Sequence, residues 1–146
     1  MDTFLEKLGP EMAAAEGEPF HPVARYYPPM DFLLYLKEDC SYRADRVDQF
    51  LTLLWHPHKE ELVGIKLKGL RVVYNRSRDR LAANGVTSWP IFALLSEILL
   101  TVLAEPLIAA LEPQRRDRLL EKYRMAVQFA ANENAAVSSE ELRRAA

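Results

Sequence analysis

Residues 51–69 read LTLLWHPHKEELVGIKLKG, two apolar runs separated by a short polar segment. From Val63 onward, apolar residues alternate with residues that include two lysines, which is typical of an antiparallel strand with one buried and one solvated face. Pro57 stands between the runs, and a proline cannot donate a hydrogen bond within a central ladder. The stretch therefore predicts a β-hairpin in which 47–55 pairs with 61–68 around an exposed polar turn.

A third strand and a change of period complete the predicted fold. In residues 31–37, apolar side chains stand at both odd and even positions, as in a strand that packs against protein on both faces. From Leu70 onward apolar residues recur at helical spacing, and Pro113 begins another amphipathic segment. We therefore expect an α+β fold, with a three-stranded, mainly antiparallel sheet (31–37, 47–55, 61–68), packed helices and a C-terminal helical subdomain.

The chain has 146 residues, the usual size of one domain, and we expect 1–146 to form a single domain. Its expected parts are an N-terminal helix with a proline-rich linker (1–30), a small β-sheet (31–69), a helical part (70–131) and a frayed tail (132–146). The tail contains a capping box, Ser138 with Glu141, but it is short and polar.

Composition and charge exclude several classes. The net charge of −2 provides no general attraction for nucleic acid. Cys40 is the single cysteine, so the chain has no internal disulfide and no cysteine-based zinc site. The N-terminus carries acids among its apolar residues and lacks the basic start of a secretory signal. We expect a cytoplasmic protein.

One apolar segment, residues 89–111, has the length of a membrane helix but not its composition. Glu97 and Glu105 interrupt it, as do two prolines. A carboxylate at the centre of a spanning helix costs roughly 2.5–3.5 kcal/mol for insertion. The segment is therefore expected to be a buried or interface helix, and no membrane association is expected.

The same segment predicts a homodimer. A helix that faces one core needs an apolar stripe of about 100° or somewhat more, whereas this one is apolar over about half of its circumference. A monomer seldom leaves a second apolar side in water. The expected contacts between the two copies are Phe92, Leu95, Leu99, Leu100 and Leu103.

The two histidines of the hairpin turn, His56 and His58, are the candidate metal ligands. Residues two apart point the same way in extended backbone, so the pair has the geometry to chelate. Zinc needs at least three protein ligands, however, and the third histidine, His21, lies far away in the sequence. A solvated turn explains the pair more simply. We expect no metal, no cofactor and no catalytic residue, which favours a non-enzymatic protein.

Residues 66–80 hold six lysines and arginines and one aspartate. Arg71, Arg76, Arg78 and Arg80 are the candidates for binding an anionic partner or nucleic acid. Arginines that flank the apolar stripe of a core-facing helix commonly lie along that helix and pair with nearby acids. That interpretation is favoured here, and nucleic acid is an unlikely partner on the overall charge.

The run DRVDQFLTLLWHPHKEELVGIKLKG, residues 45–69, resembles the core of small bacterial domains of unknown function. Those domains have a closing strand of the form V-G-I-E-I-L, and here Lys66 stands where an acid is usual. The resemblance implies no activity. We therefore expect a non-enzymatic interaction or regulatory module that acts through self-association and a protein partner. The alternatives are a metal-binding protein or enzyme that uses His56, His58 and nearby acids, and an anion-binding protein that uses the four arginines.

Overall fold

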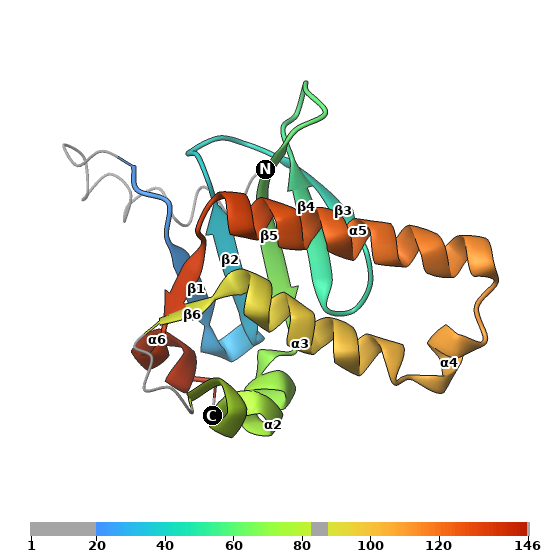
Figure 1. Cartoon of the computed structure of the whole chain (residues 1–146). Helices are drawn as coiled ribbons and strands as arrows, with labels where there is room; N and C mark the ends of the chain where they lie inside the picture. Colours follow the sequence, from blue (N-terminus) through green and yellow to red (C-terminus); the bar gives the residue numbers. More distant parts are fainter. Residues whose placement is uncertain (1–19, 83–87, 146) are drawn as a thin grey trace.

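A five-stranded antiparallel sheet, with strand order β1-β2-β5-β4-β3, organises the computed structural model (Figure 1). The strands are β1 (Ala24–Tyr27), β2 (Phe32–Leu36), β3 (Arg43–Arg46), β4 (Leu51–Trp55) and β5 (Leu62–Lys68). The structure describes residues 20–82 and 88–145, with the backbone alone at 80–82. The N-terminal helix expected within 1–30 lies outside the described residues.

The predicted hairpin is confirmed. Strands β4 and β5 pair antiparallel, with Leu53 opposite Ile65, and both of these side chains are fully buried. The backbone N–H of His56 donates to the carbonyl oxygen of Glu61 at 2.8 Å and closes the turn between the strands. The alternation of apolar and polar residues from Val63 to Lys68 therefore predicted correctly which side chains face the core.

The α+β class is confirmed, but the prediction of three strands is wrong, because an edge strand was missed on each side of the sheet. Strand β1 lies in the segment expected to be a linker. Pro22 and Pro28 flank this strand and do not interrupt it, and its Ala24 and Tyr26 are buried. Strand β3 reads RADR and has no apolar alternation. Edge strands tolerate charges and nearby prolines because one side of their backbone makes no ladder bonds.

The α-helices follow the five-stranded sheet in the sequence, and two of them, α3 and α5, lie across one of its faces (Figure 1). The helical elements are η1 (Pro28–Met30), α2 (Leu70–Ala82), α3 (Ile91–Leu103), α4 (Pro106–Ala109), α5 (Pro113–Asn132) and α6 (Ser139–Arg143). Leu53 of the sheet, Ile98 of α3 and Tyr123 of α5 are fully buried members of one core. Among the described residues, no helix combines the length and the apolar character needed to cross a membrane.

The C-terminal segment, expected to fray, is packed onto the domain. Strand β7 (Ala136–Ser138) pairs antiparallel with β6 (Ser88–Pro90), and Leu142 of α6 is fully buried. The serine half of the predicted capping box forms, with the N–H of Glu141 donating to Ser138 Oγ at 3.0 Å. The Glu141 carboxylate also accepts from the backbone N–H of Tyr26, in the edge strand β1, at 3.0 Å. The tail is ordered because it closes contacts with segments far away in the sequence.

Candidate functional site

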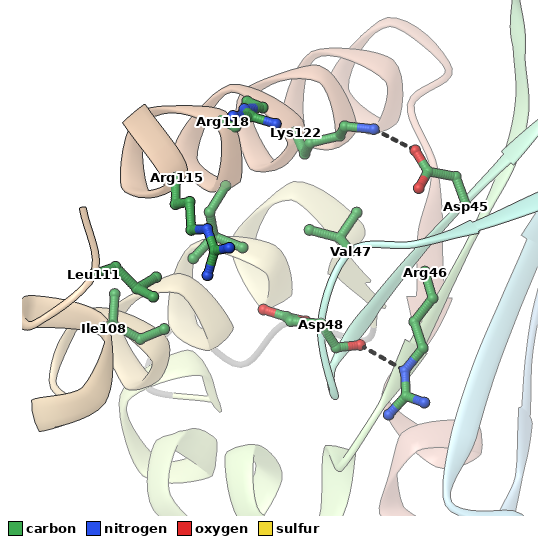
Figure 2. Close-up of a pocket in the computed structure, with 10 residues that line it drawn as sticks. Asp45, Arg46, Val47, Asp48, Ile108, Leu111, Arg115, Arg118 and Lys122 are labelled. Atoms are coloured by element: carbon green, nitrogen blue, oxygen red, sulfur yellow. Dashed lines mark hydrogen bonds and ion pairs between the residues drawn. The ribbon is translucent and has the colours of Figure 1, made fainter. Parts of the chain in front are cut away.

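A cleft of about 440 Å³ lies where the β3–β4 turn meets the corner between α4 and α5 (Figure 2). Its apolar lining is Val47, Ile108, Leu111 and Leu119, and its charged lining is Asp45, Arg46, Asp48, Arg115, Arg118 and Lys122. Because four of the six charged residues are cations, we call it the basic cleft.

Asp48 builds the turn that forms one wall of the basic cleft. Its Oδ1 accepts hydrogen bonds from the backbone N–H groups of Phe50 and Leu51, both at 2.8 Å. Its Oδ2 accepts from the hydroxyl of Tyr123 at 2.7 Å, which ties the turn to α5. Tyr123 is fully buried, and burial together with this hydrogen bond raises the pKa of its hydroxyl far above the usual value. Asp48 therefore supports the wall and does not offer free acceptor oxygens.

Two of the four cations in the basic cleft are engaged by neighbouring groups. Lys122 forms an ion pair with Asp45, and Arg46 donates from Nε to the backbone oxygen of Asp48 at 3.3 Å (Figure 2). For Arg115 and Arg118, no carboxylate of the described ranges lies within ion-pair distance. These two arginines lie in the first turns of α5, where the helix dipole is positive.

A second cavity, of about 530 Å³, adjoins the basic cleft and shares Asp48 and Ile108 with it. Its further lining comes from the β3–β4 turn, the end of α3 and α4, namely Gln49, Phe50, Val102, Glu105 and Leu107. The two cavities together extend the apolar lining past Ile108 toward Phe50 and Val102.

The histidines of the hairpin turn lie away from the basic cleft. The N–H of His58 donates to Nδ1 of His56 at 3.0 Å, and the ring centroids are 6.1 Å apart. In the part of the chain that the structure describes, no group of three or more His, Cys, Asp or Glu side chains is placed to hold a metal ion. The geometry therefore shows a turn in which one histidine accepts a backbone hydrogen bond.

The candidate arginines of α2 do not converge on one site either. Arg71 donates from Nη2 to the carbonyl oxygen of Pro28 at 2.7 Å, and Arg76 donates to the hydroxyl of Thr101 on α3. Arg78 is exposed, and the side chain of Arg80 lies outside the described residues. At least two of the four serve contacts within the fold.

The residues expected to join two copies of the chain divide between the core and the surface. Leu95 is fully buried against the sheet, so its assignment as a contact is wrong, and Leu99 is half-buried. The exposed fractions are 43% for Phe92, 57% for Leu100 and 43% for Leu103. Leu107, in α4, was not predicted and is 78% exposed. We call Phe92, Leu100, Leu103 and Leu107 the α3–α4 apolar surface.

Comparisons with protein-family models, curated proteins and solved structures found no match. The resemblance of residues 45–69 to small bacterial domains stays a prediction. Sequence analysis did not identify Arg115 or Arg118 as site residues. The signal available for them was the run PQRRDR at 113–118, which places several cations in the first turns of a helix.

Proposed function

We propose that this protein is a non-enzymatic interaction module that acts through self-association, with a second copy of the chain covering the α3–α4 apolar surface. The observation that supports the proposal is the exposure of four large apolar side chains on consecutive helices. A regulatory role through a further protein partner belongs to the same proposal.

Helix α3 has two apolar faces, and the core uses one of them. Its core face consists of Ile91, Leu94, Leu95, Ile98 and Val102, all buried. At about 100° per residue, Phe92 and Leu103 point in nearly the same direction, roughly a third of a turn from the centre of that face. Leu100 lies further round, and Leu107 continues the apolar surface beyond Pro106. The second face therefore has no partner in the described parts of the same chain.

Burial of this second face favours association. Burying a large apolar side chain is worth roughly 1.5–3 kcal/mol, and a two-fold contact buries each member of the surface twice. Contiguous apolar patches on monomers are usually small, and larger ones mark interaction sites. A second copy is the occupant that we propose, because one self-complementary patch is enough to form a closed dimer.

The titratable groups of the described region support a role other than catalysis. Burial, and then the nearby carboxylates of Glu38 and Asp39, raise the pKa of the Cys40 thiol, which disfavours a thiolate nucleophile. Asp45 and Asp48 are both held by hydrogen bonds or an ion pair to neighbouring groups. Both carboxylates thus have structural partners within the fold.

Sedimentation equilibrium on surface variants tests where the copies meet. We expect the double variant Leu100→Lys/Leu103→Lys to raise the dimer dissociation constant by about tenfold or more, since two cations would enter an apolar contact. The control is Met30→Lys in η1, because Met30 is an exposed apolar residue outside α3 and α4 (63% exposed). A double variant that dimerises as tightly as the unaltered protein, or a control that weakens the dimer as much, would contradict the assignment.

A further inference from the structure

We propose that the basic cleft binds a small amphipathic anion, a molecule with one anionic head group and a short apolar body. The basis is that Arg115 and Arg118 line the same cleft as the apolar side chains of Ile108, Leu111 and Leu119. Figure 2 shows Arg115 on the side of the cleft near Ile108 and Leu111, with Arg118 farther along α5. The inference does not depend on self-association, because no residue that lines the basic cleft belongs to the α3–α4 apolar surface.

The head group has a binding site on α5. Arg115, Arg118 and Lys122 follow one another at spacings of three and four residues, so they form a column along one side of the helix. Asp45 neutralises the last of the three. The first two have no carboxylate at ion-pair distance among residues 20–82 and 88–145. Both guanidinium groups are thus available, at the positive end of the helix dipole.

The carboxylates of the cleft do not compete for these two arginines. Asp48 accepts from two backbone N–H groups and from Tyr123, and Asp45 pairs with Lys122. Their negative charge nevertheless remains nearby, and Glu105 lines the adjoining cavity. A single anionic charge beside Arg115 is therefore favoured over an extended polyanion, which would run along these acids.

The apolar body has an apolar lining to lie against. The basic cleft, at about 440 Å³, falls within the roughly 300–1,000 Å³ of ordinary small-molecule pockets. The second cavity, of about 530 Å³, shares Ile108 with the cleft and is lined further by Phe50 and Val102. Each additional methylene group buried there tightens binding, so the length of the apolar body governs affinity.

The test uses the full chain with labelled methyl and amide groups, titrated with octanoate and followed by NMR. Three other probes separate the contributions: octylammonium carries the opposite charge, octan-1-ol is neutral, and butanoate is the shorter anion. We expect octanoate to shift the methyl signals of Val47, Ile108, Leu111 and Leu119. We also expect octanoate to bind at least about fivefold more tightly than the cation or butanoate.

The double variant Arg115→Gln/Arg118→Gln should weaken the binding of octanoate about fivefold or more and leave the affinity for octan-1-ol unchanged. The control is Arg124→Gln, also on α5, where Arg124 lies 3.6 Å from Glu121 and outside the cleft lining. Amide spectra verify that both variants are folded. Equal binding of octanoate and octylammonium, shifts confined to the α3–α4 apolar surface, or an unchanged affinity in the double variant would overturn the proposal.

Discussion

Replacing Asp48 with alanine should destabilise the protein by roughly 2–5 kcal/mol. The change leaves the hydroxyl of Tyr123, which is fully buried, without its acceptor, and such an orphaned group costs about 1–3 kcal/mol. The N–H groups of Phe50 and Leu51 lose their acceptor as well, at about 0.5–1.5 kcal/mol each before water replaces part of the loss. Tyr123→Phe should cost only about 0.5–1.5 kcal/mol, because the half-buried Asp48 keeps its two backbone donors.

Urea unfolding followed by circular dichroism measures these free energies, provided that the slope m stays constant across the variants. The decisive comparison is the double variant Asp48→Ala/Tyr123→Phe, which should be at least as stable as Asp48→Ala because it removes the orphaned hydroxyl. The exposed Asp117→Ala on α5 is the control and should stay within about 0.5 kcal/mol of the unaltered protein. Strictly additive losses in the double variant would refute the assigned role of the Asp48–Tyr123 bond.

Three further outcomes follow from the geometry. Gly64→Ala should destabilise the sheet by about 1–3 kcal/mol in urea unfolding, because an added Cβ would lie 2.4 Å from the carbonyl oxygen of Tyr35; a neutral effect would contradict this close approach. The hydrogen bond from Lys37 lowers the pKa of the Glu61 carboxyl in the folded state. The pair therefore stabilises the fold above the pKa that Glu61 has in the unfolded chain, and this stabilisation is lost as the pH falls through its folded-state pKa. An NMR titration of Lys37→Gln should show the pKa of Glu61 rising toward 4.5, and an unchanged pKa would count against the pair. Protein purified without a tag should carry no stoichiometric zinc or nickel by elemental analysis, and a metal that disappears in His58→Ala would restore the metal-site hypothesis.

Local patterns predicted the elements whose neighbours are close in the sequence. The hairpin of β4 and β5 and the start of α5 at Pro113 were predicted because alternation and proline placement act within a few residues. Strands β1 and β3 were missed because edge strands need neither full alternation nor an apolar sequence. The pairing of β6 with β7 joins segments almost fifty residues apart, and no local pattern encodes it.

The candidate sites depended on contacts that the sequence does not reveal. Asp45 meets Lys122 across 77 residues, and Asp48 meets Tyr123 across 75, so the basic cleft had no motif of fixed spacing. For helix α3 the sequence pattern was present but too broad to be decisive. Its stripe was so broad that the phase of the helix against the sheet was undetermined, and Leu95 was assigned to the wrong side.

Self-association of the unaltered chain is tested most directly by light scattering during size-exclusion chromatography at micromolar concentrations. The proposal predicts a mass near twice the 16.7 kDa of one chain, falling toward the single-chain mass on dilution. A soluble protein that keeps the mass of one chain throughout this range would contradict it, and would show that Phe92, Leu100, Leu103 and Leu107 stay in water without a second copy.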